Sequence, residues 1–412
     1  MLLNFRLANV LSLRDEQQLS LIATELNEGS ARPISTREGG KALAVLPVVA
    51  IYGANASGKT NIISGLELMR QVVLSSVGWF NDPAPERRIA FALDDAISGT
   101  PSYFEADLEI LGVRYTYGFE IDDERVRGEW LHAYPRGRRQ VWFDRADDDF
   151  QFPGSLKGDK QDLVRKTRAD ALFLSVAAEW NNEQLTPVFS WFLGIPPVLT
   201  PARQSRWFLR EAPRLSLYTG RLIASQAYRD RITRLLTVAD QGITGFDSRA
   251  LAESRIQFLH SGKPLRFDQE SLGTRAWFGL LSPLLDALDQ GLVLLVDELD
   301  ASLHPVLVTE VIRMFEDPEV NRSGAQLIFT THDATLLRPL PGGGRILDRD
   351  AVWMTEKNAS GATELYAVSG LQPPPRKDEN LERGYLVGRY GGTPRVTPGE
   401  LGRGVSEVAG ES

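Results

Sequence analysis

The feature that most constrains the fold of this chain is a glycine-rich motif at residues 53–60. Its letters, GANASGKT, match the phosphate-loop pattern G-x-x-x-x-G-K-[S/T]. The apolar run 42–52 before it predicts a buried strand at 48–52, and the segment 61–74 after it predicts a helix with one apolar face. Because strand, turn and helix in this order are the context in which the motif binds phosphate, a chance turn before a core helix is disfavoured.

The motif also predicts how a nucleotide is held. Its glycines let consecutive N–H groups point into one concavity, and the start of the following helix adds a partial positive charge. Lys59 can then reach the β- and γ-phosphates, and Thr60 can bind Mg²⁺. We therefore expect ATP and Mg²⁺ as cofactors. The expected nucleotide-binding residues of the loop are Gly53, Ala54, Asn55, Ala56, Ser57, Gly58, Lys59 and Thr60.

The composition excludes several classes of site and partner. The 412-residue chain has no cysteine, which rules out disulfides, thiolate metal sites and cysteine nucleophiles. Its net charge of −8 argues against a surface that is basic overall, so any nucleic-acid contact must come from a local patch. No apolar run approaches the roughly 18 residues needed to span a bilayer, and the first residues show no secretory signal. We expect a cytoplasmic protein without a membrane partner.

Strand patterns dominate the chain outside the motif up to residue 149. Two strands are expected within 2–30, and a loop at 32–41 leads into the strand of the motif. Two hairpins are expected after the first helix, namely 103–110 with 114–121 and 129–134 with 140–145. Residues 155–260 have a mostly helical pattern broken by prolines, and we interpret them as an inserted lobe.

A second candidate for nucleotide chemistry is the apolar strand 291–296, which ends in Asp297 and Glu298. In a buried parallel strand whose carboxyl end opens on the nucleotide, Asp297 can hold Mg²⁺ through its water shell. Glu298 can orient or deprotonate the attacking water. A strand followed by acidic turn residues is common, so this pattern alone leaves function and chance about equally favoured.

The order of the motifs adds information. Ser271-Leu272-Gly273-Thr274 precedes the acidic strand and opens an apolar helix at 277–288, and His332 ends a further buried strand after it. Taken singly, Ser271 is explained by a helix N-cap and His332 by a hydrogen-bonded histidine at a strand end. The ordered set of four motifs makes these explanations improbable for all of them together.

In this order the motifs resemble the ABC-type ATPase head shared by RecF, SMC and transporter nucleotide domains. The resemblance implies an α/β P-loop NTPase fold, an ABC-ATPase head with an antiparallel β-subdomain and a mostly helical inserted lobe. It implies that Ser271, Gly273 and Thr274 form the signature element, which caps the γ-phosphate bound by the opposite subunit. It also places Asp300 on the D-loop and His332 at the switch histidine, which contacts the γ-phosphate. The catalytic set expected on this basis is Glu298, His332 and Lys59, and the expected metal ligands are Thr60 and Asp297.

The resemblance also suggests a division of the chain into four regions. Residues 1–154 are expected to form a first ATPase lobe with the P-loop and the antiparallel β-subdomain, and 155–260 the helical insertion. Residues 261–371 are expected to form a second ATPase lobe with the signature, the Walker B strand end and the switch histidine. A C-terminal tail follows at 372–412.

A narrower likeness covers nearly the whole chain. The segments 9–15, 271–275, 299–305 and 385–394 resemble RecF-like ATPases of bacterial antiphage and abortive-infection systems, and are similar to the ATPase subunit of PARIS-type systems. The likeness implies a homodimer or higher homo-oligomer, because each composite site borrows the signature of a neighbouring copy. It also implies a separate effector protein, for instance a nuclease.

Three functions remain open at this point. The leading one is a switch that dimerises around ATP, hydrolyses it, and regulates an effector or a nucleic-acid contact in antiphage defence. The second is a RecF/SMC-like DNA-repair ATPase that acts directly on DNA, and the third is a non-hydrolytic, ATP-dependent scaffold or sensor. DNA or RNA contact would suit the mixed basic and aromatic stretches 203–214 and 136–142, although such stretches are more often solvated faces.

Overall fold

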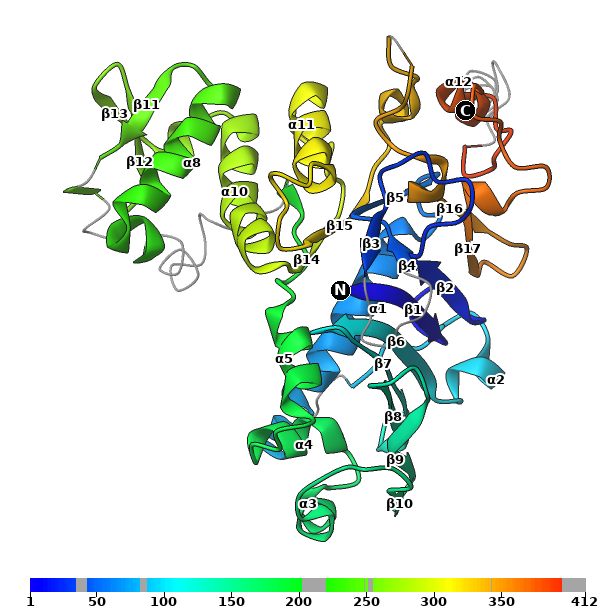
Figure 1. Cartoon of the computed structure of the whole chain (residues 1–412). Coiled ribbons are helices and arrows are strands. Elements are labelled where there is room, and N and C mark those ends of the chain that lie inside the picture. Colours follow the sequence, from blue (N-terminus) through cyan, green and yellow to red (C-terminus); the bar gives the residue numbers. More distant parts are fainter. Residues whose placement is uncertain are drawn as a thin grey trace, which may run out of the picture.

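The computed structural model describes residues 1–34, 43–81, 87–201, 220–247, 249–250, 255–341 and 343–394 (Figure 1). A five-stranded sheet lies at its centre, with the strand order β14-β15-β5-β16-β17. The first four of these strands run parallel and β17 is antiparallel to β16. The strands are β5 (Val48–Gly53), β14 (Val293–Val296), β15 (Gln326–Thr330), β16 (Val352–Lys357) and β17 (Thr363–Ala367).

The central sheet separates two hydrophobic cores. Every residue of β5 is buried, as the continuous apolar run predicts for a parallel strand covered on both faces. Because side chains alternate along a strand, Val49 and Ile51 pack into one core, and Val48, Ala50 and Tyr52 into the other. The strand that leads into the phosphate loop is therefore held from both sides.

The first core lies between the central sheet and a seven-stranded antiparallel sheet, with helix α1 (Lys59–Ser75) between them. A Cβ on Gly65 of α1 would lie 2.3 Å from Cδ1 of Leu7, so glycine permits the close approach of helix and sheet. In the order β10-β9-β8-β7-β6-β1-β2, the strands span Asp149–Gln151, Gln140–Ala146, Val126–Tyr134, Val113–Ile121, Ser102–Ile110, Leu2–Ala8 and Gln17–Ser20. Helices α3 (Lys160–Lys166), α4 (Phe173–Glu179) and α5 (Thr186–Gly194) contribute to the same core.

The second core lies on the other face of the central sheet. It contains α10 (Leu272–Gln290), α11 (Pro305–Glu316), α8 (Gln226–Ala239) and the small sheet of β11 (Ile243–Phe246), β12 (Gln257–His260) and β13 (Lys263–Arg266). Figure 1 shows these elements at one end of the molecule and the strands β6–β10 at the other.

The last described helix, α12 (Leu381–Leu386), also packs into the second core. The ring of its Tyr385 meets the ring of Tyr52 edge-on, with 5.4 Å between centroids. The remaining regular elements are β3 (Arg32–Ile34), β4 (Leu43–Val45), α2 (Asp95–Ser98) and the short 3-10 helices η1 (Ser76–Asn81), η2 (Phe267–Gln269), η3 (Ala334–Leu337), η4 (Arg349–Ala351) and η5 (Val368–Gly370).

The structure confirms the α/β P-loop fold with an antiparallel sheet, and both predicted hairpins are present as β6–β7 and β8–β9. Leu111 and Gly112 connect the first hairpin with φ values of 53° and 80°, the left-handed pair that suits a two-residue turn. The loop predicted at 32–41 is wrong at its start, because Arg32–Ile34 pairs with β4 as a strand. Residues 35–42 lie outside the described part of the chain.

Residues 155–260 are distributed over both cores. Helices α3 to α5 belong to the first core, whereas α8 belongs to the second, next to strands of the small sheet. A proline-broken helical pattern does not reveal which face of a central sheet each helix covers. The division of the chain into four domains stays a prediction. In the described ranges no helix is long and apolar enough to cross a membrane.

A buried ion pair fixes α4 to the antiparallel sheet. Glu129 of β8 is fully buried, and one of its carboxylate oxygens lies 3.8 Å from a guanidinium nitrogen of Arg145 on β9. The same carboxylate accepts hydrogen bonds from the backbone N–H groups of Phe173 (2.6 Å) and Leu174 (2.9 Å), so it caps the start of a helix whose own N-cap residue, Leu172, makes no side-chain hydrogen bond. Burial raises the pKa of Glu129, and the Arg145 charge opposes the rise.

Substitution of Glu129 by alanine should lower the free energy of unfolding by roughly 3–5 kcal/mol, because it leaves the Arg145 charge buried without its partner. Chemical denaturation followed by tryptophan fluorescence would measure the change. Glu310, which pairs with Arg313 on the exposed face of α11, is the matched control, and its alanine variant should change stability by less than about 1 kcal/mol. Equal effects at the two positions would contradict the role of the buried pair.

Candidate functional site

The carboxyl ends of neighbouring parallel strands bring the predicted residues to one edge of the central sheet. The phosphate loop follows β5, Asp297 and Glu298 follow β14, and His332 follows β15 by two residues. The prediction that His332 ends its strand is therefore wrong by these two positions, since β15 ends at Thr330. Ligands of open parallel sheets bind at this edge, so the topology alone makes it the candidate site.

The phosphate loop passes directly into α1. Gly58 has φ 104°, a left-handed conformation that favours glycine, and the helix begins at Lys59. Lys59 is buried, and its ammonium group donates hydrogen bonds to the carbonyl oxygens of Gly53 (2.8 Å) and Ala54 (3.1 Å). Burial lowers the pKa of Lys59, and the charges of Asp297, Glu298 and Asp300 oppose the decrease. The Lys59 side chain thus bends back onto the loop, and its ammonium group interacts with the charges of three acidic residues.

Thr60 and Asp297 meet as the motifs predict. The Thr60 hydroxyl lies 3.0 Å and 3.2 Å from the two carboxylate oxygens of Asp297. Hydroxyl and carboxylate oxygens are ligands that Mg²⁺ prefers, and they fit that ion here. In the described ranges no group of three or more His, Cys, Asp or Glu side chains could hold a metal by itself. Such an ion would therefore depend on Thr60, Asp297, water and the phosphates of a nucleotide.

Thr330, at the end of β15, joins the two acidic residues. Its fully buried hydroxyl donates to a carboxylate oxygen of Asp297 (2.7 Å) and accepts from the backbone N–H of Glu298 (2.7 Å). Glu298 itself has φ 55°, a left-handed conformation that costs roughly 1–3 kcal/mol outside glycine and clusters at functional sites. Sequence reasoning did not single out Thr330. A threonine at the end of an apolar strand was the available signal.

His332 and Asp300 lie at the same edge. The backbone N–H of His332 is 3.4 Å from a carboxylate oxygen of Asp300, whose other oxygen is buried and has no hydrogen-bond partner among the described residues. Partial burial and the Lys59 charge lower the pKa of His332, and Asp300, Glu298 and Asp297 oppose the decrease. The shift favours the neutral form of the imidazole, which lies within electrostatic reach of the lysine and the three acids.

The predicted signature residues lie elsewhere. The Ser271 hydroxyl caps α10 by accepting from the Thr274 backbone N–H (3.0 Å), and the Thr274 hydroxyl is 3.3 Å from a carboxylate oxygen of Asp240. Together with Gly273 they line an open pocket of about 420 Å³, whose other walls include Ser302, Leu303 and His304. In the described part of the chain, no hydrogen bond joins these residues to the loop at 53–60. Their role toward a nucleotide of another copy stays a prediction.

Of the two mixed basic and aromatic stretches, the structure describes the one at 136–142. Trp142 is buried in the first core and is not available for base stacking. Arg136, Arg138 and Arg139 lie exposed on the turn between β8 and β9. The other stretch, 203–214, lies outside the described residues.

A protein-family model matches most of the chain. Residues 48–338 match the family model described as "AAA domain, putative AbiEii toxin, Type IV TA system". Among solved structures, the SMC head domain from Thermotoga maritima is similar with 14% sequence identity and a TM-score of 0.41, over 89% of this chain and 98% of that chain. No curated protein matches the chain.

Substitution of Thr330 by valine should lower kcat/KM for ATP about tenfold or more, because both Asp297 and the Glu298 backbone lose a buried hydrogen bond. Phosphate release at several ATP and Mg²⁺ concentrations would measure the loss. Thr237 in α8, whose hydroxyl bonds to the carbonyl oxygens of Thr233 and Ile243, provides the control variant, and its valine form should retain the parent rate. A Thr330→Val protein as active as the parent would show that the hydroxyl does not organise the site.

Proposed function

The chain belongs to the family described as "AAA domain, putative AbiEii toxin, Type IV TA system", and on this premise we propose that it is an ATP-binding and ATP-hydrolysing switch. The observation that carries the proposal is the meeting of Thr60 and Asp297 at hydrogen-bond distance, with Lys59, Glu298 and His332 grouped around the same space. These are the residue types that phosphoryl transfer to water requires: a cation for the phosphates, oxygen ligands for Mg²⁺, and a carboxylate for the water.

The chemistry proposed for the site follows from where each group lies. The N–H groups of the loop bind the phosphates, and Lys59 exchanges its bonds to Gly53 and Ala54 for phosphate oxygens. Thr60 and, through water, Asp297 would hold Mg²⁺, which would supply charge neutralisation for the phosphates. Glu298 accepts a proton from water as the water oxygen attacks the γ-phosphorus, and the bond to the bridging oxygen breaks to give ADP and phosphate. The His332 side chain forms a hydrogen bond with the γ-phosphate.

We further propose that two copies close around two ATP molecules. The signature residues Ser271, Gly273 and Thr274 open α10, a helix start suited to an anion, but make no hydrogen bond to the loop of their own chain in the described residues. A second copy would place its α10 against the γ-phosphate, so the minimum assembly is a homodimer. The description of the family as a toxin of a TA system supports a regulated effector pathway, and we place the switch in antiphage defence with a separate effector protein.

Substitution of Glu298 by glutamine should leave ATP binding intact, slow hydrolysis by about 100-fold or more, and trap an ATP-bound dimer, because the amide cannot take the proton from water. Size-exclusion chromatography with light scattering, with and without ATP and Mg²⁺, would detect the dimer. Lys59→Ala is the companion variant, and it should lose nucleotide binding. If Glu298→Gln hydrolyses ATP at the parent rate, Glu298 is not the base, and if Lys59→Ala binds ATP normally, the loop is not the nucleotide site.

An ATPase that contacts nucleic acid directly is the second candidate, and one surface favours it. On the outer face of the antiparallel sheet, a pocket of about 350 Å³ is lined by Arg114, Tyr134, His132 and Arg139, among others. The Arg114 guanidinium lies 4.0 Å from the centre of the Tyr134 ring, and a guanidinium nitrogen of Arg139 lies 2.8 Å from Nε2 of His132. Within the described ranges neither arginine forms an ion pair, although the acidic Asp107 lines the same pocket, and the two guanidinium charges suit an anion such as a phosphodiester.

This candidate predicts that Arg114→Gln/Arg139→Gln weakens binding of a fluorescent single-stranded oligonucleotide and reduces the slope of log affinity against log salt by about one or two. Fluorescence anisotropy over a series of salt concentrations would measure both quantities. Arg322→Gln, at an exposed arginine paired with Glu319, serves as the control. Unchanged binding and slope in the double variant would remove this surface from consideration.

A further inference from the structure

A chain of hydroxyl groups lies against the phosphate loop and links Asn61, the residue after the loop, to Ser57 within it. The Asn61 side-chain N–H donates to the Ser12 hydroxyl oxygen (2.6 Å), Ser12 and Thr363 share a hydroxyl contact (2.7 Å), and the Thr363 hydroxyl donates to the carbonyl oxygen of Ser57 (2.8 Å). Because the single hydroxyl proton of Thr363 is donated to the Ser57 carbonyl oxygen, the Ser12 hydroxyl is the donor in its contact with Thr363. The chain therefore has one direction, from the first turn of α1 to the loop.

A second chain of the same kind starts where the first one ends. The Thr355 hydroxyl donates to the carbonyl oxygen of Tyr52 (3.2 Å), so the Ser57 hydroxyl, 2.6 Å away, must donate to Thr355. Residues 52 and 61 flank the loop and residue 57 lies within it, and each is bonded to Ser12, Thr355 or Thr363.

The loop side of the two chains is buried, whereas Ser12 and Asn61 are half-buried, and burial makes hydrogen bonds costly to lose. Thr355 is fully buried, and Thr363 and Ser57 are 1% and 3% exposed. Removal of one hydroxyl leaves a buried donor or acceptor unsatisfied, and neighbouring hydrogen bonds in one chain strengthen each other.

The glycines of the motif fit this arrangement. A Cβ on Gly53 would lie 2.3 Å from the Thr355 hydroxyl oxygen, and a Cβ on Gly58 would lie 2.1 Å from that of Thr363. The two glycines therefore do more than allow the loop to curl, because they also leave room for the outside hydroxyl groups.

The outside residues are themselves fixed. Thr355 is paired with Gly53 in the parallel register of β16 and β5, and the Thr363 backbone N–H donates to the Ser12 carbonyl oxygen (2.7 Å). The turn that carries Ser12 is anchored by Asn9, whose side-chain amide donates to the carbonyl oxygens of Ile97 and Thr100 at 2.8 Å.

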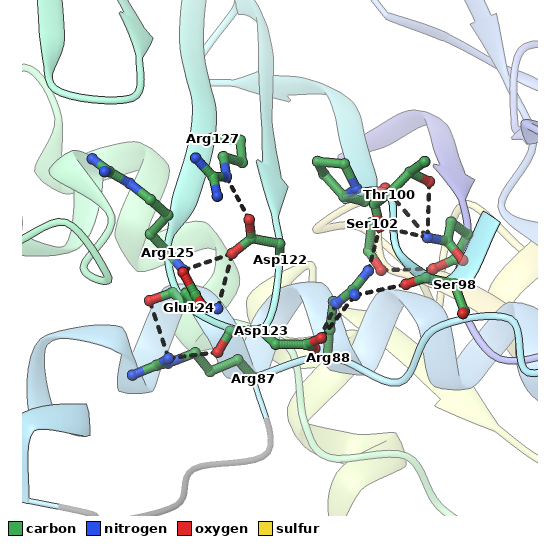
Figure 2. Close-up of polar contacts among 12 residues, drawn as sticks. Arg87, Arg88, Ser98, Thr100, Ser102, Asp122, Asp123, Glu124, Arg125 and Arg127 are labelled. Atoms are coloured by element: carbon green, nitrogen blue, oxygen red, sulfur yellow. Dashed lines mark hydrogen bonds and ion pairs between the residues drawn. The ribbon is translucent and has the colours of Figure 1, made fainter. Parts of the chain in front are cut away.

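The anchor of this turn continues into an ion-pair network. Arg88 is buried and contacts both carboxylate oxygens of Asp123, at 2.8 Å and 3.0 Å. It also donates to the carbonyl oxygens of Ser98 (2.8 Å) and Thr100 (Figure 2). The Thr100 carbonyl oxygen accepts hydrogen bonds from both Asn9 and Arg88, so the ion-pair network and the turn at 9–14 are joined at this residue.

We propose that Ser12, Thr355 and Thr363 are positioning residues for nucleotide binding, which hold the phosphate loop in its open, anion-accepting form before the nucleotide arrives. The proposal rests on the function proposed above for the loop. All the bonds in the two chains end on side chains or carbonyl oxygens, so they leave the N–H groups of the loop to the phosphates. A preorganised loop does not have to be ordered by its ligand, and this raises affinity.

The test compares Thr363→Val with Thr363→Ser. Valine keeps the shape of threonine but removes the hydroxyl, and it should weaken ADP binding about threefold to tenfold, whereas serine should restore the parent affinity. Because the three positions lie away from the reacting atoms, KM for ATP should rise while kcat at saturating ATP stays near the parent value. Isothermal titration calorimetry with ADP and steady-state phosphate release would measure these quantities.

A matched control separates positioning from stability. Thr116 in β7 donates its hydroxyl to Asp107 on the outer face of the antiparallel sheet, so Thr116→Val loses a hydrogen bond of the same type away from the loop. It should lower the melting temperature without changing the Kd for ADP. The double variant Ser12→Ala/Thr363→Val should weaken ADP binding by less than the product of the two single effects, because both substitutions interrupt the same chain of hydrogen bonds.

The outcomes are distinguishable from failure of the proposed function. If Lys59→Ala abolishes ADP binding while Thr363→Val binds as the parent does, the loop is the nucleotide site and the positioning role is wrong. If Thr363→Val weakens binding but Thr363→Ser weakens it equally, the hydroxyl is not the cause and the proposal also fails. If the parent protein and Lys59→Ala bind ADP alike, the function proposed for the loop is wrong.

Discussion

The carboxylate of Asp297 is the point on which the geometry of the site depends. It accepts hydrogen bonds from Thr60 on α1 and from Thr330 at the end of β15, while its own backbone continues β14. Three segments that are far apart in the sequence are thereby held within one hydrogen bond of each other. Since a buried carboxylate needs partners for its oxygens, the cost of leaving Asp297 unpaired favours one arrangement of these strand ends over others.

The protein uses hydroxyl groups where charges would compete with a nucleotide. Around the phosphate loop, serines and threonines supply most of the side-chain hydrogen bonds that hold the backbone, and Lys59, which bonds to the Gly53 and Ala54 carbonyl oxygens, is the charged side chain among them and interacts with the three acids. Neutral groups can brace the loop without repelling or attracting the ligand, and the charged groups keep their electrostatic effect for it. The division between bracing and binding follows from the chemistry of the side chains.

Much of this arrangement was predictable from local patterns. The motif at 53–60, the continuous apolar strands and the acidic strand end identify the fold and place most of the site, because each is encoded in a short run of residues. The bracing role escaped prediction: Ser12 lies in the segment 9–15 that carries the family likeness, but nothing in the sequence connects it with Thr355 and Thr363, which lie far away along the chain. Trp142 was misleading for the opposite reason: beside three arginines it suggests a binding surface, but strand alternation turns it into the core.

The edge-on contact of Tyr52 with Tyr385 has a mechanical consequence. Tyr52 is the residue immediately before the phosphate loop, and Tyr385 belongs to the last described helix, so α12 packs directly against the strand end that leads into the loop. The Tyr52 hydroxyl also donates to the carbonyl oxygen of Asp333, next to His332. Because Tyr52 is fully buried, a displacement of α12 would be transmitted through its ring to the backbone on two sides of the candidate site.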